Sequence, residues 1–412
     1  MENSALNLWQ ENSIKSGVTR LTLTDFRNYA HLRINANLAP IVITGENGTG
    51  KTNILEAISF LTPGRGMRSA RLADIKRISP CVVTDEYQPT EISNTSWAVS
   101  ALVSNNEDEI EIGTAVEKTA REAEEETRSF DRRIVKIDGL KTNSQAELGR
   151  YISAIWLTPQ MDRLFRGGSQ PRRSFLDRLV YAFDMEHAKR TANFEHLYKQ
   201  WYQLLKTGQN DTFWLTSLEE EMAGLGVAIA AARREQIAKL NTFIEHEPDD
   251  VFPNVKLELD GMVEKMLDTM PAIDVEEAYA RNLKNQRRNV LYNDNIDGVN
   301  RTDFKVYYKK KHMPAELCST GEQKSLLISI ILAQTKCQTL DKGFAPVLLL
   351  DEVVAHLDDN KREALLSKIR DLRVQAWITS TDPDLFNSLK NEAQFLEVKN
   401  NKVYESESFG RL

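Results

Sequence analysis

Residues 45–52 read GENGTGKT and match the phosphate-loop pattern G-x-x-x-x-G-K-[ST]. The apolar run at 41–43 predicts a buried strand before this octet, and residues 53–58 have the spacing of an amphipathic helix after it. A strand, a glycine loop and a helix in this order surround phosphate oxygens with backbone N–H groups and a positive helix end. A glycine turn that binds nothing is the weaker alternative in this context. The octet therefore predicts a site for a nucleoside triphosphate.

The octet also assigns roles to single residues. Lys51 is expected to reach the β- and γ-phosphates, and the Thr52 hydroxyl is expected to hold Mg²⁺. The predicted ATP-binding residues are Gly45, Glu46, Asn47, Gly48, Thr49, Gly50, Lys51, Thr52 and Asn53.

A second nucleotide motif lies about three hundred residues downstream, where residues 346–352 read PVLLLDE. An uninterrupted apolar run suits a strand that is buried on both faces of a parallel sheet. Asp351 at its end is placed to hold Mg²⁺ through water, and Glu352 is placed to polarise an attacking water as general base. Many strands end in acidic loops, so this signal gains its weight from the glycine octet.

A third motif, LCSTGEQK at 317–324, precedes a nearly all-apolar stretch at 325–333 that predicts a buried helix. Ser319 and Gly321 would then lie at the N-terminal end of this helix, where a hydroxyl and free N–H groups form a second anion site. The γ-phosphate of a second molecule is the natural occupant of that site. The alternative is an ordinary serine N-cap.

These motifs together resemble those of ABC-type ATPase heads and, among them, the RecF family of recombination mediators. The family resemblance is carried by six segments, which are 21–29 with Phe-Arg-Asn-Tyr, 45–52, 55–61, 64–68, 171–177 and 301–304. The resemblance implies an α/β fold in which N- and C-terminal segments build an ABC-type ATPase head and a helical second lobe is inserted. The expected limits are 1–170 and 300–412 for the head and 171–299 for the insertion.

The resemblance also implies roles for further residues. Gln160 corresponds to the Q-loop glutamine of ABC ATPases, which senses nucleotide and contacts Mg²⁺. Thr381 or Ser380 stands at the position where transport ATPases usually carry the switch histidine. Catalysis would rest on Glu352, Lys51, Gln160 and Thr381, with Ser319, Gly321, Glu322 and Gln323 acting in trans and Asp358 in the loop after the acidic motif. The chain departs from the family at 159–162, which reads PQMD, and at 298–301, which reads GVNR where Gly-Pro-His-Arg is usual.

Composition describes an ordinary globular protein. A chain of 412 residues is longer than a single hydrophobic core usually supports, so two lobes are expected. A content of 41% hydrophobic and 27% charged residues excludes a disordered or membrane-embedded chain. Residues 1–16 lack the apolar core of a secretory signal, and the three cysteines have no metal or disulfide spacing. We therefore expect a cytoplasmic protein.

The net charge of −7 does not by itself indicate a nucleic-acid ligand. Local basic clusters can still bind DNA, although a solvated surface is the more common role of each cluster. The family resemblance, and not the net charge, favours DNA as the ligand of such a cluster. The candidate contacts are Arg65, Arg68, Arg132, Lys136, Arg172 and Arg173.

Beyond residue 172 the pattern becomes that of long helices. Leu215, Leu218, Met222, Leu225 and Ile229 recur at alternating spacings of three and four, which predicts a packed seam that Gln236 interrupts. Glu219–Glu221 and Arg233–Arg234 lie off this seam by spacing. A charged hairpin is predicted over 113–133, and a strand at 304–308 is expected to return the chain to the ATPase head.

The resemblance implies an ATP-driven homodimer that binds double-stranded DNA near single-strand gaps and helps RecR- and RecO-like mediators to load recombinase, with slow, DNA-stimulated ATP hydrolysis releasing it. Two alternatives stay open at this point. One is a dimerising ATPase of the same group that acts on a non-DNA partner. The other is the nucleotide-binding subunit of a transporter, which usually carries the switch histidine and lacks the Phe-Arg-Asn-Tyr segment.

Overall fold

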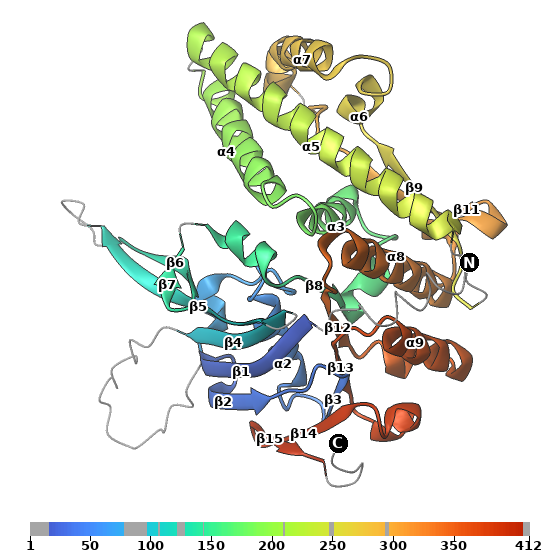
Figure 1. Cartoon of the computed structure of the whole chain (residues 1–412). Helices are drawn as coiled ribbons and strands as arrows, with labels where there is room; N and C mark the ends of the chain where they lie inside the picture. Colours follow the sequence, from blue (N-terminus) through green and yellow to red (C-terminus); the bar gives the residue numbers. More distant parts are fainter. Residues whose placement is uncertain are drawn as a thin grey trace. The chain divides into compact units, whose positions relative to one another are not determined.

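The computed structural model describes residues 16–77, 97–105, 108–121, 128–142, 144–208, 211–246, 251–292 and 296–406 of the chain. Two compact units are present (Figure 1). Unit 1 comprises Met1–Pro159 and Gln338–Leu412, and unit 2 comprises Gln160–Cys337. Unit 1 is thus built from two distant stretches, and unit 2 is inserted between them.

The observed unit 2 is longer than the insertion expected at 171–299. Its C-terminal part contains β10 (Asp303–Tyr308), which pairs with β9 (Val255–Asp260) in a three-stranded sheet with β11 (Met313–Pro314). The expectation that this strand joins the ATPase head is therefore wrong, because its backbone groups are used by β9 and β11. The boundary instead falls inside helix α8 (Thr320–Lys342).

The first sheet of unit 1 is antiparallel, in the order β2-β1-β4-β5-β6-β7. Its strands are β1 (Ser16–Phe26), β2 (Tyr29–Asn35), β4 (Ala98–Asn105), β5 (Asp108–Arg121), β6 (Arg128–Ile137) and β7 (Leu140–Lys141). Apolar residues alternate along β1, so that Leu21 and Leu23 are buried while Thr24 is exposed. The hairpin of β5 and β6 confirms the one predicted over 113–133, and residues 122–127 at its tip lie outside the described residues.

The second sheet of unit 1 carries the nucleotide motifs. Its order is β15-β14-β3-β13-β12-β8, with parallel pairing throughout except for the β14–β15 hairpin. The strands are β3 (Ile41–Thr44), β8 (Ala154–Leu157), β12 (Val347–Asp351), β13 (Ala376–Ser380), β14 (Gln394–Lys399) and β15 (Lys402–Glu405). Every residue of β3, β12 and β13 is buried, as the continuous apolar runs predict. Parallel pairing brings the carboxyl ends of these three strands to one edge of the sheet.

Helix α2 (Lys51–Ser59) follows the glycine loop and contacts both sheets of unit 1, through β1 on one side and through β12 and β13 on the other. Ile54, Leu55, Ala57 and Ile58 are fully buried along it. The remaining helices of unit 1 include α9 (Asp359–Asp371) and the short 3₁₀ helices η1 (Leu72–Ile75), η2 (Gln145–Arg150), η6 (Val354–His356) and η7 (Pro383–Leu389). Burial on two sides leaves α2 little freedom to shift.

Unit 2 is mainly helical. Its helices are α3 (Ser169–Tyr181), α4 (His187–Lys206), α5 (Thr212–His246), α6 (Met262–Met266), α7 (Ala272–Tyr292) and the part of α8 up to Cys337, with the 3₁₀ helices η3 (Pro159–Arg163), which starts at the last residue of unit 1, η4 (Lys309–Lys311) and η5 (Ala315–Leu317). The predicted seam on α5 is confirmed, since Leu215, Leu218, Met222 and Ile229 are buried in the core shared with α4 and α7. None of the helices in the described segments is long and apolar enough to span a bilayer.

The sequence predicts that Gln236 interrupts the seam. In the structure the helix continues past this residue. Helix α5 continues to His246, and the buried Gln236 donates a hydrogen bond to Gln334 of α8 at 2.8 Å. A polar side chain is tolerated in the interior because its amide has a partner there. The spacing places Glu219 off the seam, but in the structure Glu219 is buried. It accepts hydrogen bonds from Trp201 and Arg287.

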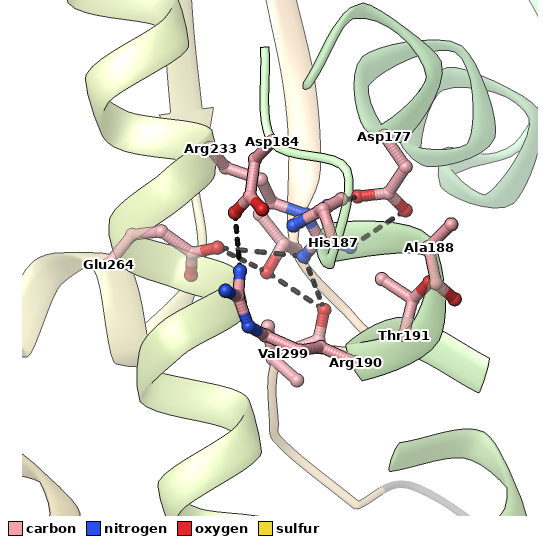
Figure 2. A network of polar contacts seen from close by, with 10 residues as sticks. Asp177, Asp184, His187, Ala188, Arg190, Thr191, Arg233, Glu264 and Val299 are labelled. Atoms are coloured by element: carbon pink, nitrogen blue, oxygen red, sulfur yellow. Dashed lines mark hydrogen bonds and ion pairs between the residues drawn. The ribbon is translucent and has the colours of Figure 1, made fainter. Parts of the chain in front are cut away.

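A buried charge network centred on Arg233 of α5 organises unit 2 (Figure 2). The guanidinium bonds both carboxylate oxygens of Asp177, at 2.7 and 2.9 Å, and donates to the Val299 carbonyl at 2.8 Å. His187 Nε2 lies 2.9 Å from Asp177, and Glu264 lies 3.7 Å from Arg233. One buried cation therefore joins α3, α5, α6 and the 298–301 loop, which departs from the family pattern.

Electrostatics in this network follow from burial and pairing. Burial alone would raise the pKa of Asp177, but the charge of Arg233 and the hydrogen bond from His187 outweigh it and lower that pKa. Burial raises the pKa of Glu264, and Arg233 offsets this only in part. Arg233 is thus a cation that both buried carboxylates share.

Substitution of Arg233 by Met should lower the free energy of unfolding by about 3–5 kcal/mol, because it leaves buried carboxylates without their cation. Urea denaturation followed by circular dichroism measures this change. The matched control is Arg234→Met, whose ion pair with Asp268 is exposed and should contribute less than about 1 kcal/mol. Equal effects of the two substitutions would contradict a structural role for the network.

Candidate ATP-binding site

The glycine loop connects the end of β3 to the start of α2 in a backbone path that only glycine follows easily. Gly45, Gly48 and Gly50 have φ of 147°, 82° and 106°. A Cβ on Gly50 would lie 2.3 Å from Asn28 Nδ2 and 2.7 Å from the Tyr29 hydroxyl. The loop thus needs glycine at position 50 for both its dihedral angle and its close packing.

Lys51 is the first residue of α2, and its side chain turns back over the loop. Only 5% of the side chain is exposed, and Nζ donates to the carbonyls of Gly45 at 2.7 Å and Glu46 at 3.0 Å. The carboxylate of Glu352 lies 3.7 Å from the same nitrogen. The structure therefore brings the loop lysine and the predicted general base together.

The two nucleotide motifs meet through Thr52 and Asp351. The Thr52 hydroxyl donates to Asp351 Oδ1 at 2.8 Å, across a separation of 299 residues. A hydroxyl and a carboxylate are oxygen donors of the kind that Mg²⁺ takes in nucleotide sites, where phosphates and water supply the remaining ligands. The described residues contain no group of three or more His, Cys, Asp or Glu that could hold a metal by itself. The donor set fits a magnesium ion shared with a nucleotide.

Thr379 of β13 is a member of this site that the sequence analysis missed. Its hydroxyl donates to the same Asp351 oxygen at 2.8 Å and accepts from the Glu352 N–H at 3.0 Å. The family resemblance instead points to Ser380 and Thr381, which follow it in the sequence. The available signal was one threonine in an apolar strand, where a buried hydroxyl needs a partner.

The Phe-Arg-Asn-Tyr segment that carries the family resemblance braces α2. Arg27, at the turn between β1 and β2, bonds both carboxylate oxygens of Glu56 at 2.9 and 2.6 Å. Glu56 is fully buried on α2 and also pairs with Arg68 at 3.2 Å. Phe26 packs edge-on against Phe60 just beyond the end of α2.

The next two residues of the segment support the glycine loop. Asn28 donates to the Thr49 carbonyl at 3.1 Å and accepts from Asn53 at 2.7 Å. Burial raises the pKa of Tyr29 to about 12, so its hydroxyl stays protonated against the loop. The turn between β1 and β2 thereby fixes both the start of α2 and the loop before it.

The opposite end of α2 is held by Arg133 of β6. This buried guanidinium donates to the carbonyls of Phe60, Thr62 at 3.2 Å and Gly64 at 2.5 Å. These carbonyls lie beyond the C-terminal end of the helix, where a cation is favourable. Burial lowers the pKa of Arg133 to about 10, which still leaves it charged at neutral pH.

The third motif lies in unit 2, where Ser319 precedes α8 in a capping box. The Ser319 N–H and hydroxyl donate to Glu322 Oε2 at 2.9 and 2.8 Å, and the Glu322 N–H donates back to Ser319 Oγ at 3.3 Å. Lys311 pairs with the other Glu322 oxygen and, with the Ser319 bonds, lowers the pKa of Glu322 to about 2. In this structure, therefore, the serine has the capping role that the sequence analysis left as the alternative.

Other predicted site residues have clear positions. Gln323 is buried and donates to the Cys318 carbonyl at 2.9 Å, so it shapes the turn before α8. Gln160 is exposed in η3 at the start of unit 2, and Thr381 is exposed after β13. Asp358 caps α9 by accepting from the Lys361 N–H, which lowers the pKa of Asp358.

The candidate DNA contacts separate into side chains that are exposed and side chains that are engaged in ion pairs or hydrogen bonds. Arg65 is exposed between two glycines, and Arg132 and Lys136 are exposed on one face of β6. Arg68 is partly exposed but pairs with Glu56. Arg172 and Arg173 are committed inside unit 2, because they bond Asp303 at 2.7 Å and the Thr302 carbonyl at 2.8 Å.

Substitution of Gly50 by Ala should destabilise unit 1 and weaken ATP binding, since the new Cβ displaces Asn28 from the loop. Gly48→Ala is the matched control, because φ is also positive there but a Cβ would meet nothing within 4 Å. Both variants incur backbone strain of about 1–2 kcal/mol, and the steric conflict adds about 1–3 kcal/mol for Gly50 alone. Urea denaturation and titration with a fluorescent ATP analogue measure the difference. Equal losses in the two variants would show that the bracing by Asn28 is unimportant.

Comparison with known proteins agrees with the geometry. Residues 17–404 match the RecF/RecN/SMC N terminal domain family. The chain is 40% identical over 392 residues to the DNA replication and repair protein RecF of Rhizobium etli (strain CIAT 652), covering 95% of this chain and 99% of the relative. It is 41% identical to the RecF protein of Mesorhizobium japonicum (strain LMG 29417 / CECT 9101 / MAFF 303099), covering 95% and 98%.

Solved structures share the fold at lower identity. The recombination mediator protein RecF-ATPrS in the RecFOR pathway superposes with a TM-score of 0.76 at 19% identity, covering 95% of this chain and 98% of that one. The corresponding RecF-ATP structure gives a TM-score of 0.73 at 19% identity, with coverage of 95% and 100%. The fold is that of an ABC-type ATPase head with an inserted second unit, and the chain belongs to the RecF family.

Proposed function

We propose that this chain is an ATP-dependent DNA clamp of recombinational repair. The observation that carries the proposal is the Thr52–Asp351 hydrogen bond, which joins the phosphate loop to the carboxylate that is proposed to hold Mg²⁺. Membership of the RecF family, with relatives about 40% identical over 95% of the chain, supplies the repair role. That role lies on chromosomal DNA, and we place the protein in the cytoplasm accordingly.

The residues of unit 1 suit ATP hydrolysis. Lys51 would bind the β- and γ-phosphates, and Thr52 and Asp351 would hold Mg²⁺, which neutralises phosphate charge when bound. Glu352, beside Lys51, would orient and deprotonate the attacking water as general base. Gln160 remains the proposed nucleotide-sensing residue, and Thr381 remains a hydroxyl proposed to orient the attacking water or to contact the γ-phosphate.

Two copies of the chain would close on ATP, with the signature residues of one copy binding the γ-phosphate held by the other. Ser319 and Gly321 are the proposed contacts, and Asp358 is a further residue proposed to act at the dimer contact. For this to happen the Ser319 hydroxyl must exchange Glu322 for a phosphate oxygen, since Glu322 now accepts both Ser319 donors. Loss of the γ-phosphate on hydrolysis would reopen the dimer.

The proposed ligand is double-stranded DNA near a gap, with RecR- and RecO-like proteins as partners in recombinase loading. Arg65, Arg132 and Lys136 are the favoured phosphate contacts because their side chains are exposed, and Arg68 follows Arg65 by three residues. Arg172 and Arg173 are weaker candidates, because contact with DNA would break their bonds inside unit 2.

Gapped duplex DNA should stimulate ATP turnover by the purified chain, and the stimulation should fade as salt rises, because phosphate contacts release counterions. In a plot of the logarithm of DNA affinity against the logarithm of salt concentration, the double variant Arg132→Gln/Lys136→Gln should have a slope that is smaller in magnitude by about 1.8. Lys51→Met serves as the blank for turnover. Turnover that ignores DNA would leave a dimerising ATPase with a different ligand.

Glu322→Gln should form the ATP-dependent dimer at about tenfold lower concentration of a non-hydrolysable ATP analogue, because it removes a negative charge from beside the incoming γ-phosphate. Ser319→Arg should bind nucleotide but stay monomeric. Light scattering after gel filtration measures both, and Glu316→Gln is the matched control, an exposed carboxylate three residues before Ser319. A normal dimer from Ser319→Arg would rule out capping in trans.

A further inference from the structure

Thr379 lies beside Asp351 and Glu352, the two acidic residues of the candidate ATP site. Strand β13 pairs in parallel with β12, and the register places Thr379 directly beside Asp351. The side chain is fully buried. A β-branched side chain in a strand has few χ1 rotamers, so the hydroxyl is presented in a defined direction.

The hydroxyl of Thr379 uses its donor and one acceptor site on neighbouring acidic residues. Its proton is donated to Asp351 Oδ1 at 2.8 Å, and its oxygen accepts the Glu352 N–H at 3.0 Å. The Asp351 oxygen also receives the Thr52 hydroxyl at 2.8 Å. Hydroxyls from β13 and α2 thus meet at one carboxylate oxygen, which restricts the rotation of the Asp351 side chain.

Glu352 has an unusual backbone conformation that this contact stabilises. Its φ is 53°, in the left-handed region that non-glycine residues seldom adopt. In this conformation the carboxylate lies 3.7 Å from Lys51 Nζ, at the phosphate loop. A strained residue at such a site persists only where its surroundings hold it, and Thr379 binds the N–H of this residue.

We infer that Thr379 is a positioning residue for ATP hydrolysis, which orients Asp351 toward the metal site and holds Glu352 in the conformation that presents its carboxylate to the attacking water. This inference rests on the proposed function, because it takes Glu352 as the general base. It gives this positioning role to the buried Thr379 of β13 and not to Thr381, which is exposed after the end of the strand.

The test compares Thr379→Val, which removes only the hydroxyl, with Thr379→Ser, which keeps it. The expected result is a fall in kcat of about a hundredfold for Thr379→Val, the loss typical of a misplaced catalytic group, and recovery to within about fivefold of the parent for Thr379→Ser. A second readout is binding of a fluorescent ATP analogue. Affinity without Mg²⁺ should stay within about twofold of the parent, and the gain in affinity on adding Mg²⁺ should shrink in Thr379→Val alone, because Asp351 loses one of its two hydroxyl partners.

Parental kcat in Thr379→Val would overturn the inference, and so would equal losses in the valine and serine variants, since the hydroxyl would then be irrelevant. A loss in Thr381→Val with none in Thr379→Val would move the role to Thr381 and overturn it as well. Should Thr379→Val fail to fold, Thr379→Cys carries the same expectation, because a thiol is a weak donor and acceptor. Thr19→Val, which removes a part-buried hydroxyl bonded to the Leu102 carbonyl of the antiparallel sheet, controls for the general effect of the substitution.

Glu352→Gln separates failure of the inference from failure of the proposed function. If Glu352→Gln hydrolyses ATP like the parent, the general-base assignment is wrong and the inference loses its basis. If Glu352→Gln is inactive while Thr379→Val is parental, the proposed function survives and only the role of Thr379 is refuted.

Discussion

The buried carboxylate of Glu56 is the constraint on which the ATP site of unit 1 depends. It lies on α2 with none of its surface exposed, and two guanidinium groups, from Arg27 and Arg68, compensate its charge. A buried carboxylate is tolerated only with such partners, so α2 cannot shift without breaking them. Because α2 begins at Lys51 and Thr52, the same pairing sets the positions of the lysine proposed to bind phosphate and of the hydroxyl proposed to hold Mg²⁺.

The Arg27–Glu56 pair also explains why the Phe-Arg-Asn-Tyr segment accompanies the phosphate loop. Phe26 packs against Phe60, Arg27 neutralises Glu56, Asn28 bonds the loop, and Tyr29 closes the space beside Gly50. The four residues form one turn between two antiparallel strands and act together on one helix. Arg133 completes this support at the other end of α2.

Unit 2 is likewise held by a buried charge, but here the central group is a cation and not a carboxylate. Arg233 is the buried cation there, and Asp177, Val299 and Glu264 surround it. It holds the 298–301 loop, in which the chain departs from the usual family pattern. The contact is made through the Val299 carbonyl, which any residue supplies, so the departure does not remove this anchor.

The sequence by itself determined the phosphate loop, the acidic strand, the family and the existence of an inserted helical unit, because these depend on local patterns of glycine, charge and apolar spacing. Only the tertiary structure decided that Thr379 joins the site, that Arg172 is committed to Asp303, and that Glu219 and Arg233 are buried. Strand register and ion pairing between distant segments set these outcomes. Neither is encoded within a single segment, since each depends on which partner the fold places opposite.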